Sequence, residues 1–408
     1  MKFNRTYFSF GTISMAFFMW GLLTSLNDIL IPHLKALFTL SYAQAMLVQF
    51  VFFMTYAILS IPLSRLLHWL GYRWTVVIGF LVAGVGCLGF WPAAGYEVYA
   101  YFLISLFVLA AGIVVLQVAA NPYVSLLGNK KSASARLTFV QGLNSLGTTI
   151  GPIIGGVFIL GAIAKAGNDI EATVRAIQIP YLVLAIIMFV LCLFFMIFPL
   201  AKLKNDVEHD ENEQYSGEEK QIWKHKHLIY GCFAIFAYVG AEVTIGSFLV
   251  NYFGSEHILK LVPEEAAKYV AFYWGGAMIG RLLGSIVLTK VHPPKAVCFN
   301  AVIAIILVAI SILSYSHIAM WAILAVGLFN SILFPTIFSL GVRELGSKTS
   351  LGSGLLCVSI VGGAIIPLVQ GILADHIGLT LSFIVPIICY LYIFFFGFYG
   401  YDAKVRIE

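Results

Sequence analysis

Twelve long apolar runs dominate this 408-residue sequence, and each is long enough to cross a bilayer as an α-helix, which takes about 20 mostly apolar residues. The runs lie near residues 7–31, 43–67, 73–94, 98–127, 136–162, 180–199, 226–253, 268–290, 295–315, 317–342, 352–375 and 380–401. Because lipid offers the backbone no hydrogen-bonding partner, a helix is the form that satisfies such a segment internally. The sequence therefore predicts an all-α membrane protein with twelve transmembrane helices.

The composition excludes most soluble classes of protein. Only 11% of the residues are charged, against about 25% in soluble globular domains. So few Lys and Arg residues also exclude a nucleic-acid-binding surface. The six cysteines all lie inside apolar runs and form no CxxC pair, so they predict neither a disulfide framework nor a zinc site. The first run is too long for the apolar part of a signal peptide, so we expect it to be a spanning helix.

A single long polar stretch divides the runs into two groups of six. It covers residues 202–224 and holds seven of the 19 acidic residues. We therefore expect an N-terminal six-helix bundle over residues 1–200, a cytoplasmic linker over 201–224 and a C-terminal six-helix bundle over 225–408. With the N-terminus inside, the cytoplasmic segments carry 18 of the 24 basic residues and the outer segments carry five. Since basic residues collect on the cytoplasmic side, both termini and the linker are predicted to be cytoplasmic.

Polar side chains at membrane depth are candidates for a functional site, because an ionisable residue at the centre of a span costs roughly 2.5–3.5 kcal/mol to insert. One helical face of the first run carries Trp20, Thr24, Asn27 and Asp28. A carboxylate and an amide suit two neighbouring sugar hydroxyls, and an indole ring suits the face of a pyranose. The alternative is a hydrogen bond between helices near the outer interface, since Pro32 follows closely.

The fourth and fifth runs carry amides. Gln117 is expected to line a cavity, whereas Asn121, one turn later, is also a candidate partner for the backbone carbonyl that Pro122 leaves free. One face of the fifth run carries Gln141, Asn144, Ser145 and Thr148. These side chains either join helices or face a wet cavity, and Gln141 and Asn144 are the stronger candidates for ligands.

The second half of the chain has its own acid. Glu242 lies one turn after Tyr238 in the seventh run, and Gly240 and Gly246 permit a break in the helix there. Broken helices are common beside transporter binding sites, which makes Glu242 a second candidate.

Three further candidates follow in the second half. Trp274 and Arg281 share a face of the eighth run. Arg281 is nearer the cytoplasmic end, where it is expected to reach the interface or to pair with an acid, and so to serve gating or structure. In the tenth run Asn330, which precedes Pro335, is a candidate ligand for a hydroxyl.

Enzyme motifs do not occur in the sequence. It contains no HExxH and no phosphate-binding loop. If the chain transports a solute, the process is therefore secondary-active or facilitative, and no cofactor is expected.

Four segments resemble the fucose:proton symporter family, which belongs to the major facilitator superfamily. They are NDILIP (27–32), AANPY (119–123), Gln141 with Asn144 and Ser145, and PTIFSL (335–340). Residues 116–123 and 144–149 are most similar to the bacterial glucose/galactose transporters of that family. The resemblance covers nearly the whole chain and implies two six-helix bundles that rock about a midplane site.

The resemblance implies import of a hexose, of the glucose or galactose type, by cation symport across the bacterial inner membrane, with the chain acting as a monomer. In the fucose permease an aspartate of the first span and a glutamate of the fourth handle proton and sugar. The first matches Asp28, and the second falls on Gln117, which cannot ionise. Glu242 stands where the fucose permease carries a glutamine. Asp28 and Glu242 are therefore predicted to couple the cation, H⁺ or Na⁺, and Asp28 is the one candidate site for Na⁺.

The superfamily also has a loop signature, G-x-x-x-D-R/K-x-G-R/K-R/K. It is degenerate after the second run, where Gly71 and Arg73 remain, and its core recurs as Gly371, Asp375 and Gly378. The resemblance implies that Arg73 and Asp375 latch loops on the cytoplasmic face, with Asp375 near helix N-terminal amides. Together with Arg281 they are the gating candidates.

Other functions stay open at this point. A proton-coupled drug antiporter favours an apolar cavity with fewer amides, and a permease for another polar solute fits the same fold. A membrane-embedded transferase needs acidic metal motifs on a large loop, but the acidic stretch 206–219 is short. The amides of the first, fourth, fifth and tenth runs favour a hydroxyl-rich substrate.

Overall fold

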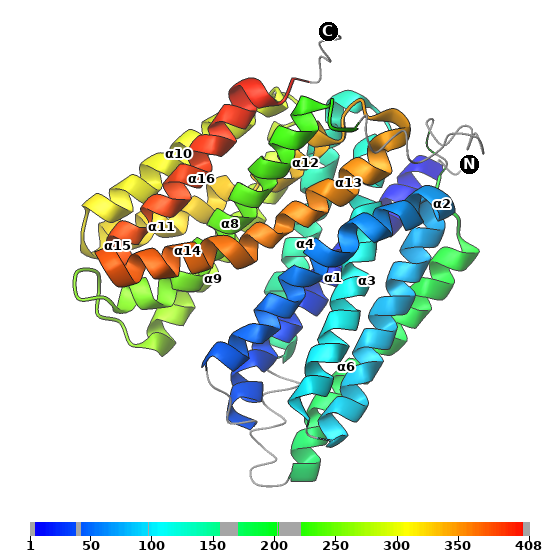
Figure 1. Cartoon of the computed structure of the whole chain (residues 1–408), viewed down its shortest axis with the longest axis horizontal. Coiled ribbons are helices and arrows are strands. Elements are labelled where there is room, and N and C mark those ends of the chain that lie inside the picture. The colour runs from blue at the N-terminus through cyan, green and yellow to red at the C-terminus, as the bar shows by residue number, and fades with distance from the viewer. Residues whose placement is uncertain are drawn as a thin grey trace. The chain divides into compact units, whose positions relative to one another are not determined.

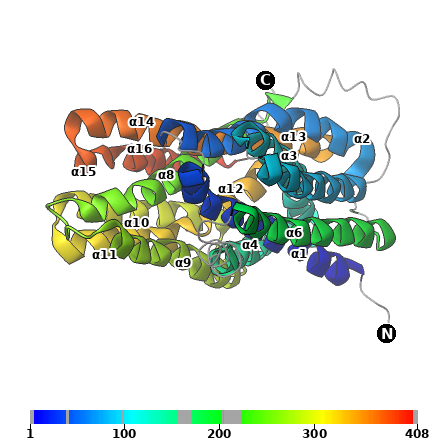
Figure 2. The same ribbon diagram turned by 90° about the horizontal axis from the view of Figure 1, so that it is seen from below.

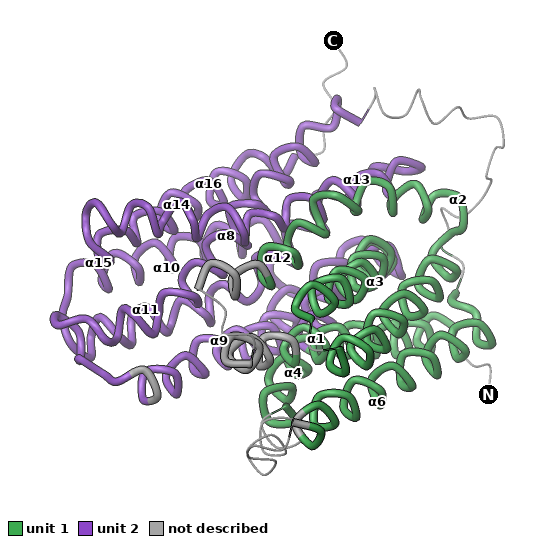
Figure 3. The backbone as a smooth tube through the Cα atoms, turned by 60° about the horizontal axis from the view of Figure 1, so that its bottom comes forward, with its two compact units in different colours: residues 1–123, 143–204 green, residues 124–142, 205–408 purple. Residues whose placement is uncertain are grey.

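The computed structural model describes residues 5–37, 42–96, 98–155, 170–201, 203 and 222–402. Within these ranges the side chains of 27–37, 42–47, 170, 173, 263 and 264 are not described. The chain forms two compact units, residues 1–123 with 143–204 and residues 124–142 with 205–408 (Figure 3). The expected linker over 201–224 falls almost entirely outside the described residues.

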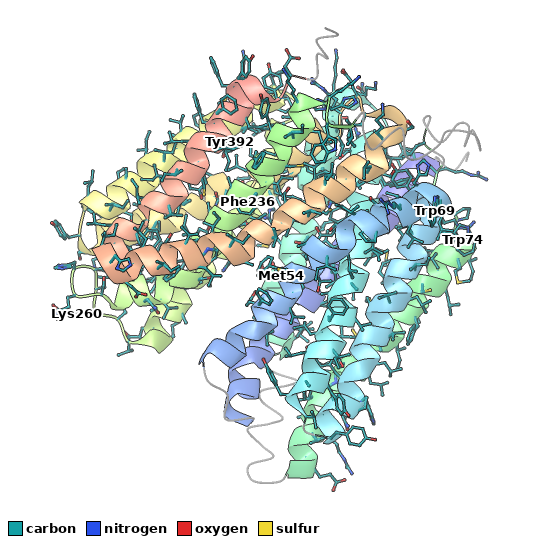
Figure 4. The ribbon with its side chains drawn as sticks, in the orientation of Figure 1. Met54, Trp69, Trp74, Phe236, Lys260 and Tyr392 are labelled. Carbon is teal, nitrogen blue, oxygen red and sulfur yellow. The ribbon has the colours of Figure 1, made fainter. Side chains whose placement is uncertain are left out.

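Unit 1 is built from long helices. They are α1 (Arg5–Leu37), α2 (Tyr42–Tyr96), α3 (Tyr99–Leu126) as far as residue 123, α4 (Ala133–Gly155) from residue 143, and α6 (Ile170–Ile197). Sequence analysis predicts separate spans over 43–67 and 73–94, and both belong to α2, which bends at Gly71 (Figure 1). Gly71 has φ 72° and ψ 173°, a conformation open to glycine, and the exposed Trp69 and Trp74 flank the bend (Figure 4).

Unit 2 contains the remaining helices. After η1 (Lys130–Ser132) and the first half of α4 come α8 (Lys226–Gly254), α9 (Pro263–Val287), α10 (Pro293–Leu313), α11 (Ser316–Asn330), α12 (Leu333–Gly341), η3 (Gly346–Lys348), α13 (Thr349–Val358), η4 (Ser359–Val361), α14 (Gly362–Ile377), α15 (Leu379–Ser382), α16 (Ile384–Phe395) and the π-helix η5 (Phe396–Gly400). α8 contacts α9, α12, α14 and α16 and lies between the α14–α16 layer and the α9–α11 layer (Figure 2). Residues on α8 are therefore well placed to join several helices.

The number of spans is consistent with the prediction. Ten helical segments of the described chain are long and apolar enough to cross a membrane, and one of them, Val48–Tyr96, contains the Gly71 bend. α4, with 23 residues, corresponds to the expected fifth span.

Two details of the second half differ from the expected spans. The tenth span is interrupted after Asn330, where α11 ends and α12 begins at Leu333. The break expected near Gly240 and Gly246 is absent, because both glycines serve close packing within an intact α8. A Cβ on Gly240 would collide with Ile366 of α14, and one on Gly246 would lie 2.8 Å from the Trp274 ring of α9.

Candidate functional site

The centre of unit 2 holds a buried ion pair. Glu242 on α8 and Arg281 on α9 are joined by Oε1 and Nη2 atoms 3.3 Å apart, and their side chains are only 12% and 13% exposed. Glu242 is the only buried acidic residue among the side chains that the structure describes. The expectation that Arg281 pairs with an acid agrees with this geometry.

The interruption of the tenth span supplies a second ligand to Arg281. Pro335 has no N–H, so the carbonyl of Ser331, four residues earlier, lacks its helical donor. Arg281 Nε donates to that carbonyl oxygen at 3.3 Å. The proline therefore both breaks the helix and creates an acceptor that holds the guanidinium beside Glu242.

A chain of hydrogen bonds connects the pair to two other helices, α11 and α16. Tyr390 of α16 donates from its hydroxyl to Asn330 Oδ1 at 2.7 Å, and Asn330 Nδ2 donates to the Tyr273 hydroxyl at 2.8 Å. Tyr273 then donates to the backbone carbonyl of Glu242 at 3.1 Å. Asn330 is fully buried, so the hydroxyls that meet its amide in this structure belong to two tyrosines.

Two aromatic residues complete the surroundings. The Tyr238 hydroxyl is buried without a hydrogen-bonding partner in the described part of the chain, and it lies close enough to Glu242 and Arg281 to interact with both charges. Its ring packs against Phe334 of α12. Trp274 is 42% exposed and contacts α8 at Gly246.

In unit 1 the predicted amides occupy contacts between helices. Gln117 is half-buried on α3 and its Nε2 donates to the Tyr56 hydroxyl of α2 at 2.6 Å. Asn121, one turn further along α3, is fully buried. These two amides therefore lie on the face of α3 that is turned toward the interior of unit 1.

The α1–α4 contact contains two other predicted residues. Asn144 Nδ2 donates to the Phe17 carbonyl of α1 at 3.0 Å, and Gly21 leaves room for the Asn144 backbone. Trp20 is buried, with its ring centroid 4.1 Å from that of Phe17. Gln141 is buried in the part of α4 that belongs to unit 2. Asn27 and Asp28 lie in α1, but their side chains are outside the described residues.

The remaining gating candidates lie at helix ends. Arg73 caps the C-terminus of α6, because its Nε donates to the Phe195 carbonyl at 3.2 Å and its Nη2 donates to that of Met196. This gives Arg73 a contact within unit 1.

Asp375 lies at the end of unit 2 away from Arg343. His227, at the start of α8, contacts the Arg343 carbonyl, which marks the end of unit 2 that is predicted to be cytoplasmic. α14 runs away from that end, and Tyr252, near the end of α8, packs against Phe383, just beyond α15. Asp375 is exposed in the last turn of α14 at this opposite end, and α15 begins four residues later at Leu379.

Sequence reasoning missed Tyr273 and Tyr390. A signal was present, since a tyrosine inside an apolar span needs a partner for its hydroxyl. It also missed Gln370, an amide within the eleventh span that is fully buried on α14.

Comparisons with known proteins identify the class. A model of the Major Facilitator Superfamily matches residues 9–356. A crystal structure of FucP, a transporter of that superfamily in the outward conformation, superposes with a TM-score of 0.91 at 30% identity, covering 98% of this chain and all of the other. The chain is therefore a multi-pass membrane transporter that belongs to the Major Facilitator Superfamily, and its predicted fold is confirmed.

More specific relatives cover nearly the whole chain. The glucose/galactose transporter of Brucella abortus is 51% identical over 96% of this chain and 94% of its own length. A putative glucose/galactose transporter of Helicobacter pylori is 44% identical, with 97% of each chain covered. The L-fucose-proton symporter of Escherichia coli is 32% identical over 97% of this chain and 93% of its own.

Proposed function

We propose that this protein imports a hexose of the glucose or galactose type together with a proton, by alternating access. The observation that carries the proposal is the 51% identity to the Brucella abortus glucose/galactose transporter over nearly the full length of both chains. The proton is supported as the coupling ion by the relation to the L-fucose-proton symporter of Escherichia coli.

Asp28 is the proposed proton acceptor on α1. A carboxylate at membrane depth is costly while charged, and a bound proton removes that charge. Proton binding therefore lowers the free energy of closing the cavity around the site, which ties movement of the sugar to movement of the proton.

Glu242 is the proposed second coupling residue. A carboxylate that is ion-paired to Arg281 in a buried site holds its charge, because removing either partner leaves an uncompensated charge. Glu242 therefore takes a proton only in a conformation in which Arg281 has moved away. Protonation of Glu242 would then depend on the conformation of the second half of the chain.

The sugar ligands are proposed from both halves. They are Asn27, Gln117, Asn121, Gln141 and Asn144 for hydroxyls, Asn330 within the tyrosine network, and Trp20 or Trp274 for the sugar ring. Gln117 is the best supported of the described residues, because it is half-buried and a single tyrosine hydroxyl is bonded to its amide nitrogen.

The cellular setting is also part of the proposal. We infer a monomer in the bacterial inner membrane with both termini cytoplasmic, built from bundles over 1–200 and 225–408 joined by the linker 201–224. The bias of Lys and Arg toward the predicted inner segments supports this orientation.

The test is uptake of labelled D-glucose, D-galactose and L-fucose into proteoliposomes, with a pH gradient and a Na⁺ gradient imposed separately. We expect glucose or galactose to accumulate when the lumen is alkaline and not when Na⁺ alone is driven inward. Accumulation driven by Na⁺ alone would overturn the proton assignment, and failure to move any hexose would overturn the substrate class.

The variant Asp28→Asn separates coupling from binding. It should keep hexose exchange and lose accumulation, whereas the control Glu256→Gln, at an exposed acid, should keep both. Full accumulation by Asp28→Asn would show that another residue carries the proton.

A further inference from the structure

The contact between α8 and α14 has a regular register. A Cβ on Gly362 of α14 would collide with the Phe236 carbonyl of α8, and a Cβ on Gly240 of α8 would collide with Ile366 of α14. Both pairs are 126 residues apart, as expected for two helices that run in the same direction, and Phe236 is labelled where the two helices pass each other (Figure 4). One turn further along both helices, the same spacing places Thr244 beside Gln370.

Thr244 and Gln370 are both fully buried and their polar atoms have no partner among the described residues. The atoms are Thr244 Oγ1, Gln370 Nε2 and Gln370 Oε1. A buried polar atom without a hydrogen bond is strongly unfavourable, and most such atoms in native proteins bond to protein or to ordered water. Three of them on one turn of a helix contact therefore need an explanation.

The rotamer of Thr244 adds to the argument. Thr24, Thr55 and Thr75 each donate to the carbonyl four residues earlier, at 2.7–2.8 Å. That is the usual solution for a threonine inside a helix. Thr244 does not make this bond, so its hydroxyl is available to another partner.

The described surroundings leave no protein group for that role. On the far side of the turn, a Cβ on Gly371 would lie 3.7 Å from the ring of Phe248. The other face of α14 is exposed and apolar, and it presents Ile365, Leu368, Val369 and Ile372. Glu242 is two residues from Thr244, about 200° around α8, and faces α9 instead. The polar atoms are thus separate from the ion pair, and the groups described around this turn are apolar.

We propose that Thr244 and Gln370 form a binding site for a single hydroxyl-bearing guest between α8 and α14. The amide nitrogen donates to the guest oxygen, the amide oxygen accepts its O–H, and the threonine hydroxyl supplies a third bond. This chemistry fits a resident water molecule, and it fits one hydroxyl of the transported sugar. The second source rests on the proposed function, whereas the first does not.

The test compares thermal unfolding of the full-length protein in detergent without sugar. If a water occupies the site, Gln370→Met and Thr244→Val should each lower the unfolding midpoint, and the double variant should lower it by less than the two effects combined, because both residues share one guest. The control Leu368→Met, on the exposed face of α14, should leave the midpoint unchanged. If both variants instead raise the midpoint, no resident water occupies the site, and the response to sugar decides whether a guest binds there.

Adding the sugar distinguishes the two sources. A resident water predicts lower midpoints without sugar and an unchanged stabilisation by glucose or galactose. If the guest is a sugar hydroxyl, the midpoints of both variants without sugar should be no lower than the parent's. The apparent affinity for sugar, read from the rise of the midpoint with sugar concentration, should then be at least tenfold weaker in both variants. If the midpoints without sugar are not lowered and the sugar response stays intact, no guest binds there. Should Gln370→Met fail to fold, Thr244→Val is compared with Thr244→Ser, which keeps the hydroxyl. This comparison distinguishes the same outcomes.

Discussion

Arg281 Nη2 lies 3.3 Å from Glu242 Oε1, and the same guanidinium donates through Nε to the Ser331 carbonyl that Pro335 leaves without a helical donor. The ion pair thus joins α8 to α9 and to the interruption between α11 and α12. An arginine held by two acceptors in a buried site is fixed in one place, which makes the pair sensitive to any displacement of these helices.

Breaking this pair should be costly. Arg281→Met leaves the Glu242 carboxylate buried without its partner, and we expect a loss of about 3–5 kcal/mol in stability. The double variant Glu242→Leu/Arg281→Met should recover most of that loss, because no charge is then left uncompensated. Thermal unfolding of the single and double variants in detergent checks this, and equal stability of Arg281→Met and the parent would contradict it. Uptake should stay defective in the double variant if the pair is needed for coupling.

The tyrosine–asparagine chain gives a second prediction. Tyr390→Phe leaves Asn330 Oδ1 buried without its donor, which should lower stability by about 1–3 kcal/mol. Tyr273→Phe removes the bonds of the tyrosine hydroxyl to Asn330 Nδ2 and to the Glu242 carbonyl. The double variant should lose less stability than the sum of the two single losses, because both tyrosines bond to Asn330. Tyr399→Phe, at a 65% exposed ring, is the control. Strict additivity in the double variant would mean that the chain does not act as a unit.

Sequence reasoning reaches the spans and the buried charges because their signals are local. A run of apolar residues shows a span, and an acid such as Glu242 inside one shows a special environment. The partners of these groups are harder to find, since Tyr273 and Tyr390 lie 57 and 60 residues from Asn330 and meet it only when three helices pack together. The position of Asn330 in an apolar run predicts a ligand for hydroxyls, but spacing alone does not identify the tyrosine hydroxyls that reach it.

Asp375 shows a different limit. Its loop motif marks the turn that follows α14 but carries no information about the direction of that helix. Because α14 runs from the Arg343 end of unit 2 to the opposite end, the motif lies at the end of this unit away from Arg343. A motif locates a turn, whereas the number of helices that precede it decides on which side of the membrane the turn lies.

Protonation at the start of α8 should lower stability. Burial and then the nearby charge of Lys348 lower the pKa of His225 in the folded protein. The unfolded chain binds the proton more readily, so this contribution is intact above the ordinary histidine pKa of about 6.5 and is lost as the pH falls through that value toward the folded pKa. The unfolding midpoint of the parent should therefore drop on going from pH 7 to pH 5. His225→Gln should lessen that drop, while His317→Gln, at an exposed site, should not.

Close helix contact at Gly327 should be as important as the polar groups that it brings together. A Cβ there would collide with the Tyr273 carbonyl, so Gly327→Ala must push α11 away from α9 and disturb the bond between Asn330 and Tyr273. A Cβ on Gly275, on the same α9 helix, would meet no atom within 4 Å, and alanine there should be neutral or stabilising by up to about 1 kcal/mol, since alanine favours a helix more than glycine does. We expect Gly327→Ala to lower both the unfolding midpoint and hexose uptake, and Gly275→Ala to match or exceed the parent in stability. If the two variants behave alike, the separation of α9 and α11 does not control the network around Glu242.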